Sequence, residues 1–233
     1  MVVTGEARPA PGALVFDVNE TLLDLGALDS FFAERFGDRR LRRVWFSQLL
    51  QSSLVSTVTG RYRDFGTIGH AALELVAARA GVVITEQDHA DLVMRMAALP
   101  AHAEVAEALR RLDEAGFELA VLGNSTARVL EAQLATSGLA PLVQEVISAD
   151  EVKRLKPAPE PYVHATARLQ RAPSSLMLVS AHDWDVAGAL RVGCRAAFVD
   201  RSGSGLDPLV EEPPELVGTD LRDVALQLAA LAV

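Results

Sequence analysis

An acidic residue follows directly on a short apolar run near the start of the chain. Ala13-Leu14-Val15-Phe16 is typical of a buried strand, because it is short and contains branched and aromatic side chains, and Asp17 comes next. A carboxylate at the end of a buried strand projects from the edge of a sheet, where it can serve as a nucleophile. Alone, the residue is better explained as a turn or capping aspartate.

Two further polar clusters follow later in the chain. Lys156 precedes Pro157, and a proline restricts the backbone before it, which suits a fixed cation beside a carboxylate. The run Val179-Ser180-Ala181-His182-Asp183-Trp184-Asp185 is an acid-rich loop after another apolar run. A surface lysine and a helix N-terminus that favours acids are the plain structural interpretations. The three clusters together, in this order and each after a strand, favour one common site.

The elements that must position these clusters alternate between strands and helices. Helical patterns over residues 104–114 and 127–137 each end at a glycine, Gly116 and Gly138. This alternation predicts an α/β fold with a doubly wound, parallel, Rossmann-like sheet, which binds ligands at the carboxyl ends of its strands. Besides 13–16, the predicted strands are 117–122, 176–179 and 196–199, with a weaker one at 145–147.

A helical block interrupts the alternation after the first strand. It holds patterns over 28–36, 39–53, 65–80 and 86–98, and no convincing strand. We therefore predict a core domain of residues 1–24 and 101–233 and an all-helical cap of residues 25–100 over the active site.

Composition excludes several classes of function. The formal net charge of −9 disfavours a nucleic-acid partner, whose phosphates would be repelled. The only cysteine, Cys194, cannot form an internal disulfide and is expected to pack as a small hydrophobic residue. No apolar stretch reaches the roughly 18 residues of a membrane span, and the first residues lack the features of a signal peptide. We expect a cytoplasmic protein that binds neither membrane nor nucleic acid.

The three clusters resemble the motifs of the haloacid dehalogenase superfamily, and within it the type II (S)-2-haloacid dehalogenases. The run Gly60-Arg61-Tyr62-Arg63-Asp64-Phe65 and the spacing from Lys156 to Tyr162 support the resemblance. It implies that Asp17 displaces halide from a short 2-halo carboxylic acid. Water then hydrolyses the aspartyl ester to the 2-hydroxy acid, and neither metal nor cofactor takes part. The small-molecule substrate is the implied partner, and a homodimer remains open.

The resemblance also assigns roles to residues. Thr21 would orient the carboxylate of Asp17, Lys156 would keep its pKa low, and Asp185 would position Lys156 and the hydrolytic water. The implied halide and substrate pocket consists of Asn19, Phe46, Phe65, Asn124, Ser125, Tyr162, Ser180, His182 and Trp184.

The sequence departs from the dehalogenase pattern in the cap and around the pocket. Phe46 stands where the family has a halide-binding arginine, and the nearby Arg42 and Arg43 are expected on a solvated helix face. His182 replaces an asparagine, and three roles stay open for it: it would compensate in part for the lost cation, supply a base for the water, or only hydrogen-bond the loop. Asn19 replaces an aromatic residue, and Gly123 replaces a serine for which Ser125 is the candidate substitute.

Two alternatives stay open. A Mg²⁺-dependent phosphatase of a small phosphorylated metabolite would need a second aspartate where Asn19 stands, and another acid where Ser180 stands. Both absences argue against it, although Asp183 could in principle replace one ligand. The other alternative is a weakly active or non-catalytic relative that binds a small acid or a protein partner.

Overall fold

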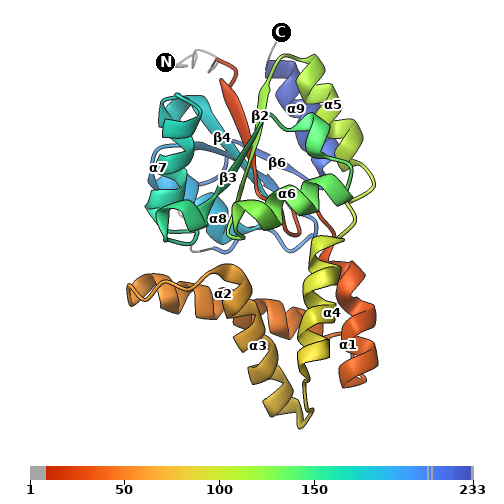
Figure 1. Cartoon of the computed structure of the whole chain (residues 1–233). Helices are drawn as coiled ribbons and strands as arrows, with labels where there is room; N and C mark the ends of the chain where they lie inside the picture. Colours follow the sequence, from red (N-terminus) through yellow and green to blue (C-terminus); the bar gives the residue numbers. More distant parts are fainter. Residues whose placement is uncertain (1–8, 209, 211, 232–233) are drawn as a thin grey trace.

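A computed structural model describes residues 9–208, 210 and 212–231 of the chain. Its centre is a parallel sheet in the order β3-β2-β1-β4-β5-β6 (Figure 1). The strands are β1 (Ala13–Phe16), β2 (Glu118–Gly123), β3 (Glu145–Ser148), β4 (Leu176–Ser180), β5 (Arg195–Val199) and β6 (Leu216–Gly218). The predicted α/β fold is confirmed.

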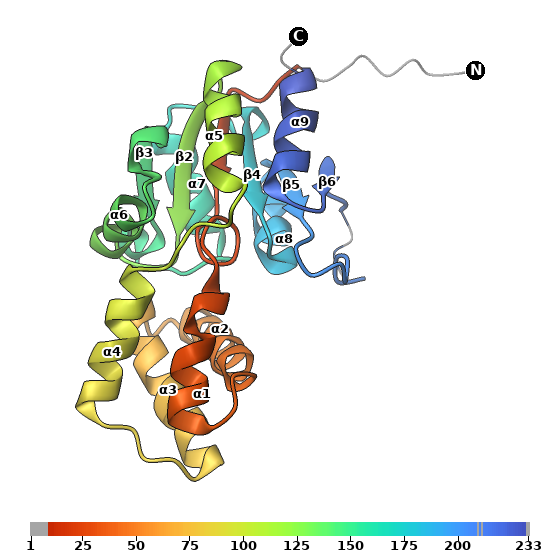
Figure 2. The ribbon, with the colours of Figure 1, turned by 90° about the vertical axis from the view of Figure 1, so that its right-hand side faces the viewer.

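Helices cover both faces of this sheet, which explains why the central strands are continuous apolar runs rather than alternating ones. Every residue of β1, β4 and β5 is buried. One face carries α5 (Val105–Glu114), α6 (Ala127–Thr136) and α9 (Leu221–Leu231), and the other carries α7 (Pro159–Arg168) and α8 (Asp183–Arg191) (Figure 2). Short 3₁₀ helices cover Leu25–Leu28, Ala140–Leu142, Ala149–Val152 and Pro173–Ser175.

The chain order places a topological switch at β1. From β1 the chain moves to β2 and β3 on one side, and it returns to β4 on the other side. The loops that leave β1, β2 and β4 therefore diverge at the carboxyl ends of neighbouring strands, where a crevice forms. Asp17, Asn124 and the 181–185 segment all lie at this edge of the sheet.

The inserted block after β1 is helical, as predicted. It contains α1 (Asp29–Phe36), α2 (Leu41–Val58), α3 (Phe65–Ala80) and α4 (Glu86–Ala97), which lie together beyond the carboxyl edge of the sheet (Figures 1 and 2). Asp64 caps α3 by accepting from the Thr67 amide at 2.9 Å. Thr85 and Asp88 form a reciprocal capping box at the start of α4.

Helices α2 and α3 pack closely because a glycine lies between them. Trp45 Nε1 donates to the carbonyl oxygen of Gly69 at 3.0 Å, and a Cβ at Gly69 would lie 3.2 Å from Leu49 Cδ1. A larger residue would push the two helices apart.

The two segments that connect the sheet to the helical block, near Asp24 and near Pro100, run side by side. The amide of Asp24 donates to the carbonyl oxygen of Pro100 at 2.9 Å, and Leu23 forms an antiparallel bridge with Ala101. The domain division at 24/25 and 100/101 remains a prediction.

Some elements differ from the sequence-based expectation. Helix α2 continues to Val58, five residues beyond the expected end, through a serine-rich stretch in which Ser53 Oγ donates to the carbonyl oxygen of Leu49. Strand β6 was not predicted, because three residues after a proline pair carry too little periodicity. Cys194 is buried among apolar side chains, which raises the pKa of its thiol to about 11 and confirms its expected packing role. No helix within the described ranges is long and apolar enough to cross a membrane.

Candidate active site

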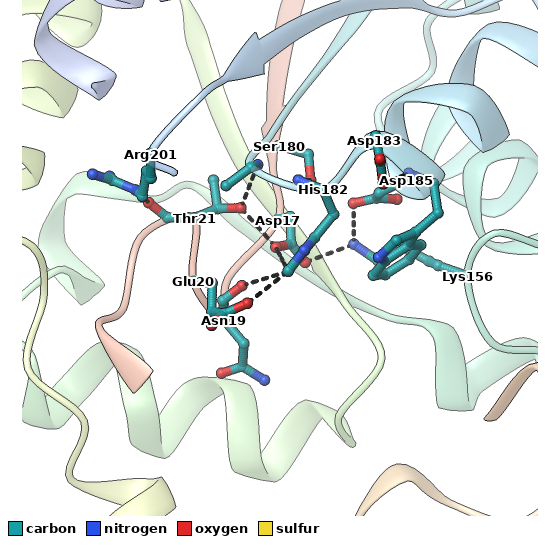
Figure 3. A network of polar contacts seen from close by, with 12 residues as sticks. Asp17, Asn19, Glu20, Thr21, Lys156, Ser180, His182, Asp183, Asp185 and Arg201 are labelled. Carbon is teal, nitrogen blue, oxygen red and sulfur yellow. Dashed lines mark hydrogen bonds and ion pairs between the residues drawn. The ribbon is translucent and has the colours of Figure 1, made fainter. Parts of the chain in front are cut away.

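Asp17, Lys156 and Asp185 form a buried line of alternating charge at the carboxyl edge of the sheet (Figure 3). Lys156 Nζ lies 2.8 Å from Asp17 Oδ1 and 2.7 Å from Asp185 Oδ2, and it donates to the carbonyl oxygen of Leu122 at 2.9 Å. The three donor directions of an ammonium are thus all used. The structure brings these three predicted catalytic residues together.

Thr21 binds the other oxygen of Asp17. Its hydroxyl donates to Asp17 Oδ2 at 2.7 Å and accepts from the amide of Ala181 at 2.9 Å. The carbonyl oxygen of Thr21 accepts from Arg201 Nη2 at 2.7 Å. The loop after β1 is therefore tied to the ends of β4 and β5, and the Asp17 carboxylate is held on both sides.

The charges around Asp17 favour its ionised form. Burial opposes ionisation, but the Lys156 ammonium, His182 and the hydrogen bonds from Lys156 and Thr21 outweigh it, so the pKa of Asp17 lies below its ordinary 3.8. For Asp185, burial outweighs the attraction of Lys156 and, with the negative charge of Asp17, raises the pKa. Burial alone would lower the pKa of Lys156, yet the two carboxylates raise it. Asp17 therefore gives up its proton more readily than Asp185.

Tyr162 holds Asp185, the last residue of this charged line, in place. Its hydroxyl donates to Asp185 Oδ1 at 2.6 Å, and burial followed by the Asp185 charge raises its pKa well above 10.0. Gly188 of α8 packs against the ring so closely that a Cβ there would lie 2.5 Å from the hydroxyl oxygen. Tyr162 thus fixes Asp185 and has no surface in the chamber described next.

A small chamber of about 10 Å³ opens beside Asp17 between sheet and helical block. Six of the predicted pocket residues line it: Asn19, Phe46, Phe65, Asn124, His182 and Trp184. The other three lie elsewhere. Ser125 faces a neighbouring cavity, Ser180 accepts from the amide of His182 at 3.1 Å, and Tyr162 lies behind Asp185. Their binding roles remain predictions.

Asn124 is fixed by one end of its amide. Its Oδ1 accepts from the backbone amide of Lys156 at 2.7 Å, beside the cis peptide bond between Lys156 and Pro157. This leaves Nδ2 as the donor end of the side chain. Asn124 follows β2, as the sequence indicated, and links the second strand to the lysine loop.

His182 lies over Asp17 among oxygen acceptors. Its Nε2 lies 3.1 Å from the carbonyl oxygen of Asn19, 3.7 Å from Asp17 Oδ2 and 4.0 Å from Glu20 Oε2 (Figure 3). Because a carbonyl oxygen only accepts, Nε2 carries a proton and the ring is a donor at this position. The ring stacks on Trp184 at 5.0 Å between centroids and packs on Phe46 at 5.9 Å.

Arg42 contradicts the expectation of a solvated helix face, whereas Arg43 is exposed as expected. Arg42 Nε lies 2.6 Å from Asp29 Oδ1, and Nη1 lies 3.3 Å from Glu20 Oε1. The packing of α2 against α1 buries this arginine, and the two carboxylates pair with it. It therefore does not line the chamber in place of the family arginine, but holds Glu20 near His182.

Sequence reasoning missed three residues that support the site. Glu20 joins Arg42 to His182, Gln133 donates to Asn19 Oδ1 at 3.2 Å, and Arg201 fixes the loop of Thr21. Glu20 lies within the first motif and could have been suspected there. Gln133 belongs to an amphipathic helix and Arg201 to a turn, so nothing in their local sequence marks them.

The side chains near Asp17 do not fit a magnesium site. Asn19 Oδ1 accepts from Gln133, Ser180 Oγ accepts from His182, and Asp183 accepts from the amides of Trp184 and Asp207. Magnesium requires several oxygen ligands in a nearly octahedral shell. In the part of the chain that the structure describes, no three His, Cys, Asp or Glu side chains are grouped to hold a metal. Independence from metal remains a prediction.

Comparisons with known proteins agree with this geometry. A family model described as haloacid dehalogenase-like hydrolase matches residues 11–193. The chain is 31% identical to (S)-2-haloacid dehalogenase 1 of Pseudomonas sp. (strain CBS-3), over 81% of this chain and 84% of that protein. It is 28% identical to (S)-2-haloacid dehalogenase 2 of the same strain, over 88% of this chain and 90% of that protein.

A solved structure extends the likeness to three dimensions. The L-2-haloacid dehalogenase of Xanthobacter autotrophicus with chloropropionic acid covalently bound superposes with a TM-score of 0.84 at 26% identity, covering 94% of this chain and 98% of that one. The resemblance inferred from the motifs is thereby confirmed over most of the length. The chain belongs to the haloacid dehalogenase-like hydrolases.

Proposed function

We propose that the protein is a 2-haloacid dehalogenase in which Asp17 is the nucleophile. The observation that carries this proposal is the buried Asp17 carboxylate, held by Lys156 on one oxygen and Thr21 on the other, facing a chamber without a magnesium ligand set. The family membership and the haloacid dehalogenase relatives support it.

In the first step an Asp17 oxygen attacks C2 of the substrate. The carbon–halogen bond breaks with its electron pair, halide leaves, and an ester joins C2 to Asp17. Lys156 keeps the nucleophile ionised in a buried site, because it offsets the penalty of burial. Asn124 Nδ2 and the edge of Phe65 form the receiving side for the departing halide.

In the second step water attacks the carbonyl carbon of the ester. The bond between that carbon and the former Asp17 oxygen joined to C2 breaks, and this oxygen leaves as the hydroxyl of the 2-hydroxy acid after taking one proton of the water. The second proton is released to solvent, and the water oxygen stays in the regenerated Asp17 carboxylate. Lys156 and Thr21 are placed to stabilise the negative charge that develops on the ester oxygens. Asp185 contributes by holding Lys156, since its two oxygens bind Lys156 and Tyr162.

His182 acts as a donor rather than as the base in this arrangement. Its Nε2 is surrounded by the oxygens of Asn19, Asp17 and Glu20, and only a protonated nitrogen is stable among them. We assign to it the electrostatic role that an arginine at the position of Phe46 has in the family. It stabilises the charge of Asp17 and of an anionic ligand in the chamber.

The phosphatase alternative lacks support from the site. An acid–base group two residues after Asp17 would have to be Asn19, whose oxygen accepts from Gln133. Asp183, the remaining candidate ligand, is bound to the amides of Trp184 and Asp207. Nothing at the chamber favours phosphoryl transfer over attack on carbon.

The decisive experiment measures halide release from racemic 2-chloropropionate and fluoroacetate in excess chelator, with Asp17→Asn as the matched blank. Halide release by the parent alone is expected. In ¹⁸O-labelled water, a single turnover should leave the product unlabelled and place one heavy oxygen in the peptide that contains Asp17. Phosphate release that needs added Mg²⁺, without any halide release, would establish the phosphatase instead. If Asp17→Asn equals the parent in every assay, the chain is a non-catalytic relative.

A further inference from the structure

A second cavity, of about 150 Å³, lies next to the chamber at Asp17. Its walls are mainly apolar side chains of the helical block and of α6, with Trp45, Leu49, Leu92, Met96 and Val129 among them. Phe65 lines both spaces and therefore lies between them. Val129 belongs to this lining and is 37% exposed, so it borders both the cavity and the solvent.

The sizes of the two spaces differ in a way that matters for a substrate. The chamber at Asp17 has about 10 Å³, which is at the limit of what admits one water molecule. A 2-halo acid therefore needs more space beside Asp17 than this chamber offers. An apolar cavity of about 150 Å³ accepts a molecule as large as benzene.

From these observations we infer that the cavity behind Phe65 is a binding subsite for the apolar substituent on C2 of the substrate. The inference rests on the proposed function. When the Phe65 ring turns, the carboxylate and C2 stay at Asp17, and an alkyl chain of several carbons extends between α2, α4 and α6. The enzyme then prefers 2-halo acids with longer alkyl chains over two- and three-carbon acids.

The cavity lining contains one carboxylate, that of Asp64, beside the polar side chains of His70, Ser125 and Thr126. Asp64 belongs to the lining, and its carboxylate is bound to the amide and hydroxyl of Thr67 at 2.9 and 2.6 Å. A second carboxylate on the substrate would be repelled by this charge. Each buried methylene should strengthen binding by about fourfold, the change that its transfer from water brings.

The test compares binding of unhalogenated alkanoates, which does not depend on turnover. Calorimetry with propionate and hexanoate would be run on the parent, on Val129→Phe, which narrows the cavity from its rim, and on Val163→Phe. Val163 is an exposed valine of α7 outside the cavity and is the matched control. We expect hexanoate to bind the parent and Val163→Phe at least tenfold more tightly than propionate, and Val129→Phe to lose that difference.

Equal binding of the two acids by the parent would overturn the inference. So would an equal weakening of both acids by Val129→Phe, because that result would make the cavity a common passage or a folding determinant. Halide release from 2-chloropropionate by the same proteins tests the proposed function separately. A parent that releases halide but binds both alkanoates alike would therefore refute the subsite alone.

Discussion

Lys156 Nζ lies 2.8 Å from Asp17 Oδ1 although 139 residues separate them in the chain, and both side chains are buried. The pair lies at the carboxyl end of β1, where the chain has placed β2 and β3 on one side and then places β4 on the other. The loop that carries Lys156 therefore meets β1 only in the folded protein. A buried pair of this kind is costly to break from one side, because the remaining charge is left uncompensated.

Lys156→Met should lower kcat/KM by roughly 10²–10³-fold and raise the pH at which the residual activity appears. In the parent, the pKa of Asp17 lies below 3.8, so activity should persist until the pH falls through that lowered value. Without the lysine cation, burial should raise the pKa of Asp17, and the acid limb of the pH profile should therefore move to higher pH. The pH dependence of kcat/KM checks this, with Lys156→Arg keeping the charge. An acid limb at the same pH in Lys156→Met would contradict the role of the cation.

Thr21→Val should reduce kcat by about tenfold or more and lower the free energy of unfolding by about 1–3 kcal/mol. The variant removes the donor to Asp17 Oδ2 and leaves the amide of Ala181 without its acceptor. Thr166→Val is the control, because that buried hydroxyl donates only within α7, to the carbonyl oxygen of Val163. Steady-state kinetics and urea unfolding of both variants are the measurements. An unchanged kcat in Thr21→Val would show that the hydrogen bond from Thr21 to Asp17 does not contribute to catalysis.

Gly188→Ala should destabilise the protein by about 1–3 kcal/mol, because its methyl group would meet the ring and hydroxyl of Tyr162 and Cβ of Pro157. The closest of these atoms is the hydroxyl oxygen at 2.5 Å. Tyr162→Phe removes it, so the double variant should lose less stability than the sum of the single variants. Thermal unfolding of the four proteins completes the cycle. Strict additivity would mean that the backbone of α8 shifts instead of the ring.

His182→Asn should lower kcat/KM by about 10–100-fold and move the acid limb of Asp17 upward, since His182 helps to hold that pKa low. The substitution restores the residue that the family has at this position. It also removes the donor above Asp17, and no cation stands at position 46 to replace it. His164→Asn is the control, because that histidine pairs with Glu151 away from the chamber. A gain of activity in His182→Asn would show that the imidazole obstructs the site and does not replace the missing arginine.

The local sequence was sufficient to predict the frame of the site. Asp17 and Asn124 each follow a strand whose apolar residues are buried on both faces of the sheet. Such continuous apolar runs can be recognised in the sequence without knowing which strands they pair with. Parallel strands must end at a common edge, so the meeting of these residues with Lys156 and Asp185 could be expected from their order in the chain. The inserted helices were predicted from the helical periodicity of their apolar residues alone.

The tertiary structure alone separated the implied pocket residues that line the chamber from those that lie behind it. Arg42 and Phe46 lie one turn apart on α2, yet Phe46 packs on His182 whereas Arg42 is buried against Glu20 and Asp29. The hydrogen bonds from Tyr162 to Asp185 and from Gln133 to Asn19 also join residues that are far apart in the chain.

The sequence by itself therefore predicted five of the six strands of the described sheet and the carboxylate at the end of the first one, because a buried apolar run and the residue that follows it are local patterns. The shape and charge of the chamber depend on how separate elements pack against each other, and that packing is set by contacts between residues far apart in the chain.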